Sequence, residues 1–247
     1  MSLRNRRLII AIDGPAGSGK SSTAKALAMR LRVPYIDTGA MYRALTLKAM
    51  RRGIPFLKKT RLVAISRKTH IRLSGGDPSR QRVLLDGKDV TREIRLPEVT
   101  KNVFYIAQEP LIRKELVRMQ RAMGKRGGGV MEGRDIGTVV FPDADYKFYF
   151  EASPKIRARR RYEELLQAGG VLTLRSVLKD IKKRDKTDYE RKNSPLKRAK
   201  GAVLIDTTRL TINQTIDKIM SMIDSNPLIS VKLKRLYRST VKRGKES

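Results

Sequence analysis

A glycine-rich loop between an apolar run and a helical pattern places the strongest constraint on this chain. The loop is Gly14-Pro15-Ala16-Gly17-Ser18-Gly19-Lys20-Ser21, and it follows the apolar run from Leu8 to Ile12. Apolar residues at helical spacing come next, namely Ala24, Leu27, Ala28 and Leu31. Glycines let backbone N–H groups turn toward phosphate oxygens, and the start of a helix favours anions. The sequence therefore predicts a phosphate-binding loop in a strand–loop–helix context.

This loop predicts a nucleoside triphosphate site. We expect Lys20 to reach the β- and γ-phosphates and the Ser21 hydroxyl to ligate Mg²⁺ that arrives with ATP. The predicted ATP-binding residues are Gly14, Pro15, Ala16, Gly17, Ser18, Gly19, Lys20, Ser21 and Ser22. Asp13 and Asp37 end predicted strands near the loop, where either a water-mediated magnesium role or a structural turn or cap is compatible with their position.

Composition excludes several classes of protein. A chain of 247 residues with 40% hydrophobic content can bury a full α/β core, as one large domain or as a core with inserts. With no cysteine and a single histidine, a disulfide framework, a thiolate zinc site and a histidine-based metal centre are excluded. No apolar stretch approaches the roughly 18 residues that a spanning helix needs. We therefore expect a cytoplasmic protein with no membrane partner.

The charge of the chain is unusual. The sequence has 56 Lys plus Arg against 24 Asp plus Glu, a net charge of +32. Such a charge attracts polyanions, either nucleotides or nucleic acids, although basic residues scattered over solvated faces would give the same total. Residues 225–247 form a basic tail that we expect to be mobile. Its charged residues are Lys232, Lys234, Arg235, Arg238, Lys242, Arg243, Lys245 and the single acid Glu246.

Five short apolar runs predict buried parallel strands. They are Leu8 to Ile12, Pro34 to Ile36, Val130 to Met131, Tyr146 to Phe150 and Val203 to Ile205. Helical patterns separate them, which is typical of a doubly wound sheet with helices on both faces. Ligands of such sheets bind beyond the carboxyl ends of the strands, and the polar motifs of this chain follow its predicted strands.

One segment breaks the alternation of strands and helices. His70 to Leu73 and Arg82 to Leu85, with turn sequences after each, predict short antiparallel strands. We expect an inserted subdomain at 54–96, within a core formed by 1–53 and 97–224. From Glu98 onward the sequence resumes a helical pattern, which runs through Leu116 and Met119.

Arginine is concentrated in the polar motifs. The arginines concerned are Arg43, Arg134, Arg157, Arg159, Arg160, Arg161, Arg184 and Arg191. Transfer of a phosphoryl group between two phosphorylated molecules gathers several negative charges, which guanidinium groups can bind with paired hydrogen bonds. The chain has no Asn-Lys-x-Asp tetrapeptide for reading guanine, so the pattern favours a kinase over a GTPase.

Five stretches together resemble the bacterial cytidylate kinases, a family of P-loop nucleoside monophosphate (NMP) kinases. They are residues 12–21, 37–43, 86–95, 132–144 and 184–196, and the resemblance covers residues 8–224. It implies transfer of the γ-phosphate of ATP to CMP, and to dCMP, with Mg²⁺ accompanying ATP. It also implies the P-loop NMP-kinase fold: a five-stranded parallel sheet with helices on both faces, a small NMP-binding insert with antiparallel strands, and a helical lid at about 155–195.

The resemblance implies roles for single residues. Arg43, Arg134 and Arg191 match arginines that hold the monophosphate, and Thr38 matches a hydroxyl near it. The pair Arg184 and Asp188 matches residues that grip the ribose. The catalytic residues implied are Lys20, Arg134 and Arg191, with Arg157 and Arg161 from the lid.

Arg113 and Asp135 match the residues that read cytosine. A carboxylate can accept the amino group of that base, and a guanidinium can donate to its carbonyl and ring nitrogen. Phe104 stands where the family often has a serine that helps to hold the base, which leaves the preference among CMP, dCMP and UMP open.

Two alternatives remain open at this stage. One is a kinase for UMP or another nucleoside monophosphate. The other is a P-loop ATPase whose main partner is RNA, which the net charge and the basic tail would favour. The chain has no tryptophan, only 5% aromatic residues and no recognised RNA-binding motif. Nucleic acid is therefore expected to bind only through non-specific charge, and we expect the chain to be a monomer.

Overall fold

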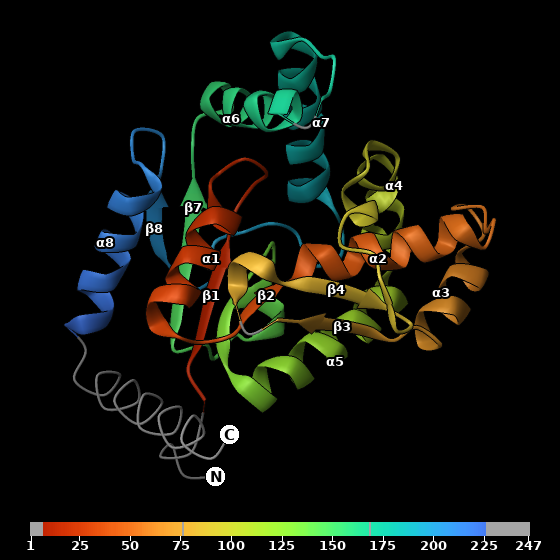
Figure 1. Cartoon of the computed structure of the whole chain (residues 1–247), viewed down its shortest axis with the longest axis horizontal. Coiled ribbons are helices and arrows are strands. Elements are labelled where there is room, and N and C mark those ends of the chain that lie inside the picture. The colour runs from red at the N-terminus through yellow and green to blue at the C-terminus, as the bar shows by residue number, and fades with distance from the viewer. Residues whose placement is uncertain (1–6, 76, 168, 226–247) are drawn as a thin grey trace.

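The computed structural model describes residues 7–75, 77–167 and 169–225 (Figure 1). The predicted basic tail lies outside the described residues, except for Ser225.

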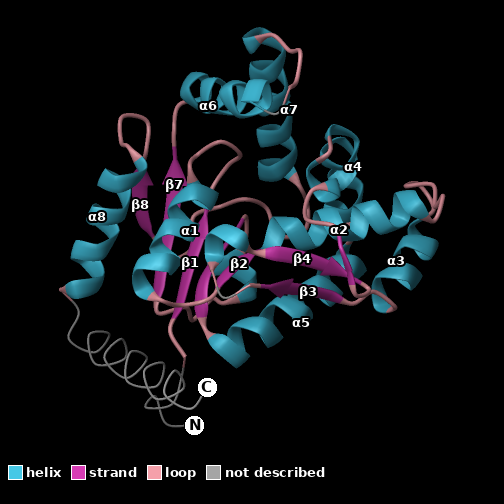
Figure 2. Cartoon of the chain, in the orientation of Figure 1, coloured by secondary structure: helices cyan, strands magenta, loops and turns pink. Residues whose placement is uncertain are grey.

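The core of the fold is the five-stranded parallel sheet that the sequence predicts (Figure 2). Its strands are β1 (Ile9–Asp13), β2 (Tyr35–Asp37), β6 (Gly129–Gly133), β7 (Tyr146–Glu151) and β8 (Val203–Asp206), in the order β2-β6-β1-β7-β8. Asp13 is in register with Gly133 on one side and Tyr149 on the other. The carboxyl ends of these central strands therefore lie at one edge, and the loops that follow them meet there.

Both faces of β1 are covered by helices. Ile10 and Ile12 pack against α1 (Lys20–Leu31) and α8 (Ile212–Asp224). Ile9 and Ala11 point to the other face, where α5 (Pro110–Gly127) and the π-helical turn η4 (Ile136–Val140) lie. A central parallel strand buried on both faces reads as a continuous apolar run, which is why Leu8 to Ile12 could be identified from sequence.

The segment that breaks the alternation forms a small antiparallel sheet, as predicted. The sheet consists of β3 (Ile71–Ser74), β4 (Arg82–Leu85) and β5 (Lys88–Asp89). The same segment also contains α3 (Lys59–Arg67) and the short turns η2 (Pro78–Arg80) and η3 (Glu93–Arg95). Leu62, Val83 and Leu85 share one apolar core with α2 (Thr38–Arg51), α4 (Pro97–Gln108) and α5. The insert is thus anchored on helices of the main body.

The helical pattern that begins near Glu98 forms two helices, α4 and α5, and not one. The break is at Glu109, whose backbone is extended (φ −79°, ψ 117°), and Pro110 begins α5. Proline disfavours helical geometry in the residue before it and has no N–H for a helical hydrogen bond. The Glu109 side chain accepts a hydrogen bond from Leu111 N and so caps the new helix.

Two helices form a hairpin beyond the carboxyl end of the sheet. These are α6 (Pro154–Gln167) and α7 (Leu174–Glu190), which pack together through Ala158, Val177 and Ile181. In Figure 1 the hairpin stands above the loop that joins β1 to α1. Within the described part of the chain, every helix is too short or too polar to traverse a bilayer.

Candidate active site

The loop between β1 and α1 is held tightly between two neighbouring elements. Gly14 has φ +149°, and a Cβ there would lie 2.3 Å from the Phe150 carbonyl oxygen of β7. Gly17 has φ +74°, and a Cβ there would lie 2.8 Å from the Arg157 carbonyl oxygen of α6. Only glycine fits both positions, because other residues meet the neighbouring backbone and rarely adopt these angles. The loop predicted from sequence is therefore shaped by β7 and α6 together.

Lys20, the first residue of α1, is folded back onto this loop. Its Nζ donates to the Pro15 carbonyl oxygen at 2.7 Å, and the Ser18 hydroxyl lies 3.5 Å away. Burial and the neighbouring positive charge of Arg134 lower the pKa of Lys20 to about 7. The next two residues, Ser21 and Ser22, are exposed in the first turn of α1. The loop thus presents a buried amine and exposed hydroxyls at a helix start, the groups that bind phosphates.

Asp37, at the end of β2, has a structural role. Its carboxylate accepts from Ala40 N at 2.8 Å, which caps α2, and from Arg43 Nη2 at 2.9 Å. Burial pushes the pKa of Asp37 upward, but Arg43, the Ala40 amide and more distant positive charges together outweigh burial and lower that pKa. Thr38 follows, and its hydroxyl donates to the Glu132 carbonyl oxygen at 2.7 Å. These contacts fix Arg43 and Thr38 at the carboxyl edge of the sheet.

The end of α7 faces the end of β6 through an ion pair. Arg134 Nε lies 2.9 Å from Asp188 Oδ2, and Arg191 Nη1 lies 4.0 Å from Asp188 Oδ1. Burial raises the pKa of Asp188, but Arg134 and Arg184 outweigh that effect and lower it. Arg191 also donates from Nε to the Ser194 carbonyl oxygen at 2.5 Å. One carboxylate is thus shared among several arginines from two elements.

The two residues expected to read the base are in direct contact. Arg113 of α5 forms an ion pair with Asp135, which follows β6, and the two residues are only 4% and 5% exposed. Arg113 Nη1 also donates to the Ala107 carbonyl oxygen at 3.1 Å. The guanidinium lies over the ring of Tyr42, 5.4 Å from its centroid. Buried charges need partners, and here each charge holds the other in place.

Positive charge is in excess at this edge of the sheet. Burial and the nearby Arg134 lower the pKa of Arg184 to about 10, and Arg43 and Arg161 add to that shift. Among the guanidinium nitrogens of the described residues, three are buried without a hydrogen-bond partner, namely Arg43 Nε, Arg113 Nε and Arg191 Nη2. Leaving a buried donor unpaired costs roughly 1–3 kcal/mol. Each of these atoms belongs to an arginine predicted to bind the second substrate, so an anionic, hydrogen-bonding ligand would satisfy them.

The two lid arginines predicted to be catalytic occupy different surroundings. Arg157 is 4% exposed, and its nitrogens donate to Asp185, to Ala16 O and to Ala152 O. Arg161 is half-buried, and its Nη1 pairs with Glu164 at 2.9 Å. Arg157 therefore joins the α6–α7 hairpin to the phosphate-binding loop, whereas Arg161 contributes charge near Arg184.

Three residues that shape the phosphate-binding loop, Arg160, Asp185 and Thr207, received no individual role from the sequence. Arg160 donates to Thr207 O at 2.7 Å, and the Thr207 hydroxyl donates to Ser18 O at 3.0 Å. Asp185 is the partner of Arg157. Arg160 is part of a visible basic run, but no local pattern distinguishes it from its neighbours, because Thr207 is distant in sequence. The position of Asp185 beside Arg184, in the stretch 184–196, indicated only that it lies near the site.

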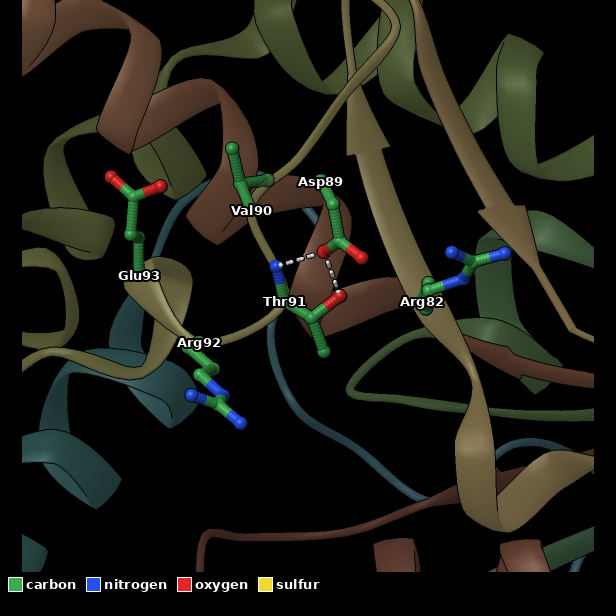
Figure 3. A pocket seen from close by; sticks show the side chains of 6 residues that line it. All are labelled: Arg82, Asp89, Val90, Thr91, Arg92 and Glu93. Carbon is green, nitrogen blue, oxygen red and sulfur yellow. Dashed lines mark hydrogen bonds between the residues drawn. The ribbon is translucent and has the colours of Figure 1, made fainter.

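Cavities also open on the described surface. One of about 320 Å³ adjoins the phosphate-binding loop, and its lining includes the predicted site residues Pro15 and Arg157. Another, of about 570 Å³, lies on the insert (Figure 3). There Asp89 accepts from both Thr91 N and the Thr91 hydroxyl, a local turn between the exposed Arg82 and Arg92. No predicted site residue lines the cavity on the insert.

Comparison with known proteins agrees with this geometry. The family model described as cytidylate kinase matches residues 10–225. The cytidylate kinase of Caldanaerobacter subterraneus subsp. tengcongensis is 49% identical over 222 residues, which cover 90% of this chain and 97% of that protein. That of Desulforamulus reducens is 49% identical over 215 residues, 87% of this chain and 96% of that protein. With agreement of this extent, the chain belongs to the cytidylate kinase family.

Proposed function

We propose that this chain transfers the γ-phosphate of ATP to CMP, giving ADP and CDP, and that it also accepts dCMP. The observation that carries the proposal is the buried Arg113–Asp135 pair beside arginines with unpaired buried donors. Membership of the cytidylate kinase family supports it. A carboxylate and a guanidinium held together at this depth suit the amino group and carbonyl of cytosine.

ATP binds to the loop between β1 and α1. Its phosphates replace Pro15 O as the partner of Lys20 Nζ, and the loop amides and helix start add further donors. The exposed Ser21 hydroxyl, together with phosphate oxygens and water, provides the oxygen ligands that Mg²⁺ prefers. Ser21 would hold the ion, which neutralises charge on the β- and γ-phosphates when bound.

CMP binds between the strand ends and α7. Arg43, Arg134 and Arg191 donate to its 5′-phosphate, near Thr38, and the unpaired donors of Arg43 and Arg191 support this placement. Arg184 and Asp188 hold the ribose. Residues 54–96 act as the NMP-binding insert and 155–195 as the lid, on a core of 1–53 and 97–224.

The reaction needs no general base. The second pKa of a phosphate monoester is about 6, so the attacking oxygen is already ionised at neutral pH. Catalysis then consists of in-line positioning and neutralisation of charge, which Lys20 and the arginines provide. The lid excludes water and brings Arg157 and Arg161 to the transferred group. A monomeric state and a cytoplasmic location stay predictions.

A coupled ADP-release assay with CMP, dCMP, UMP, AMP and GMP tests this proposal. We expect turnover with CMP and dCMP to exceed that with UMP by at least about tenfold, because uracil lacks the amino group that would donate to Asp135 and presents a carbonyl oxygen to that carboxylate instead. Equal rates with CMP and UMP would contradict the base-reading role of Asp135. No nucleoside diphosphate from CMP and ATP would contradict the function itself.

A further inference from the structure

The carboxylate of Asp13 holds the turn that carries Asp135. Asp13 is the last residue of β1 and is 3% exposed. Its Oδ1 accepts from Ile136 N at 2.8 Å, and its Oδ2 accepts from Gly137 N at 2.7 Å. Both carboxylate oxygens are therefore engaged by backbone donors of one turn, directly after the residue expected to read the base.

This turn has an uncommon conformation that needs support from outside. Asp135 has φ −147° and ψ 27°, and the π-helical turn η4 begins at the next residue. The first amides of any helical turn have no acceptor within it, and π turns are rare and often lie at functional sites. Asp13 supplies the missing acceptors at this end.

The opposite end of the turn is held as well. Arg121 of α5 donates from Nη2 to Val139 O at 2.6 Å and from Nε to Val140 O at 3.0 Å. A carboxylate at the amino end and a guanidinium at the carboxyl end thus fix η4 between them. The position of Asp135 depends on the same turn.

A charge at the depth of Asp13 is costly, and its backbone partners offset that cost. Burial raises the pKa of Asp13 to about 6 even though the Gly137 and Ile136 amides lower it. The negative charge of Asp135 raises it further, and the positive charge of Lys20 lowers it. These are the charged groups that act on Asp13 from the turn and from the phosphate-binding loop. The hydrogen bonds from the Gly137 and Ile136 amides thus favour the ionised form of Asp13 at this depth.

We propose that Asp13 is a positioning residue that fixes the place of Asp135 in the site for the second substrate. Its main chain continues into Gly14 of the phosphate-binding loop, and its side chain orients Asp135 toward cytosine through the Ile136 and Gly137 amides. The inference rests on the proposed function, because it assigns base reading to Asp135.

The variant Asp13→Asn tests this role. Its amide has the shape of the carboxylate but can accept from only one backbone N–H, and it directs its own NH₂ at the other. We expect kcat/KM for CMP to fall at least about tenfold, since small misplacement of a binding group costs up to about a hundredfold. We expect the ratio of kcat/KM for CMP to kcat/KM for UMP to fall by a similar factor. The KM for ATP changes by less than about twofold.

Asp145→Asn is the matched control. Asp145 Oδ2 accepts from Ile9 N at 2.8 Å, so it is a carboxylate acceptor for the same strand at its opposite end. We expect this variant to keep the preference for CMP over UMP. An unchanged preference in folded Asp13→Asn, or the same narrowing in Asp145→Asn, would overturn the proposal.

A second variant decides the question if Asp13→Asn does not fold. Arg121→Met removes the donors to Val139 and Val140 at the far end of the turn and leaves β1 intact. A narrowed preference supports the positioning role of the turn and its anchors, and an unchanged preference overturns it. The affinities of CMP and UMP, measured by calorimetry alongside turnover, distinguish a failure of the Asp13 proposal from a failure of the proposed function. Wild-type protein that prefers CMP but forms no CDP contradicts the proposed function alone.

Discussion

Arg157 of α6 and Asp185 of α7 form a bidentate ion pair. Nη1 lies 2.9 Å from Oδ1 and Nη2 lies 2.6 Å from Oδ2, and the two side chains are only 4% and 15% exposed. The same Nη1 donates to Ala16 O of the phosphate-binding loop at 3.1 Å. One guanidinium therefore links α6, α7 and the loop, so the position of the α6–α7 hairpin and the shape of the loop depend on each other.

Asp185→Ala is expected to destabilise the protein. It leaves the Arg157 charge buried without its carboxylate, which costs about 3 kcal/mol in the free energy of unfolding. Urea denaturation measures this change. The control is Glu163→Ala, which breaks the Arg159–Glu163 pair on the surface of α6, where both side chains are more than half exposed. Loss of such a pair changes stability by less than about 1 kcal/mol. Equal effects of the two substitutions would contradict the structural role of Asp185.

Lys20→Ala should lower kcat by about a hundredfold or more, because it removes the amine proposed to bind the transferred phosphoryl group. Stability should hardly fall, since burial of this amine is unfavourable and lowers its pKa. Steady-state kinetics and thermal unfolding measure the two effects. Arg30→Ala is the control, because Arg30 is exposed in the last turn of the same helix and pairs with Asp217. Near-wild-type turnover of Lys20→Ala would rule out the role of Lys20.

ATP binding above neutral pH should take up a proton. The pKa of Lys20 is lowered to about 7, so at pH about 8 most molecules without nucleotide carry a neutral amine. Adjacent phosphate oxygens favour the charged amine, so binding raises that pKa and draws a proton from the buffer. The uptake should shrink as the pH falls through 7, because the amine is then already protonated. Calorimetry in buffers of different ionisation enthalpy measures the uptake, which Lys20→Met should abolish. Proton release at pH about 8 would contradict the expected sign.

Arg134→Ala should impair the use of CMP more than the use of ATP. Arg134 pairs with Asp188 and lowers the pKa of Lys20 and Arg184, so it lies among the groups proposed to hold the phosphates. We expect kcat/KM for CMP to fall by about a hundredfold or more. Arg118→Ala, which removes an exposed arginine of α5, serves as the control. An Arg134→Ala enzyme with a normal kcat/KM for CMP would exclude this role.

Local patterns explain which parts of the structure could be predicted from sequence. The run from Leu8 to Ile12 identified β1 because its residues pack on both faces, and the glycines of the following loop identified the phosphate site. Pro110 carried the signal for the break between α4 and α5, but the apolar period on either side of it suggested one helix. The position of Asp13 allowed either a magnesium role or a cap, and only the folded chain shows both oxygens engaged by η4.

Contacts between residues distant in sequence could not be predicted in the same way. Arg157 and Arg160 lie in one basic run, yet the first binds Asp185 and the second binds Thr207. Nothing in the run distinguishes these partners, because they come from α7 and from the segment after β8. The excess of arginine in the polar motifs predicted a site that binds anions. The sharing of Asp188 between Arg134 and Arg191 could not be predicted, because it depends on the topology that places α7 against β6.

Deletion of residues 226–247 should leave CMP turnover unchanged. The described fold ends with α8, whose Ile216, Ile219 and Ile223 are buried, and none of the proposed site residues lies beyond it. The deletion removes seven basic residues and one acid. Because non-specific binding to RNA depends on the number of phosphates neutralised, any affinity for single-stranded RNA should fall and become less sensitive to salt between about 50 and 200 mM. Filter binding measures the RNA affinity, and the coupled ADP-release assay measures CMP turnover. Loss of CMP turnover in the deletion variant would contradict this prediction, whereas full CMP turnover with weakened RNA binding would separate the basic tail from catalysis.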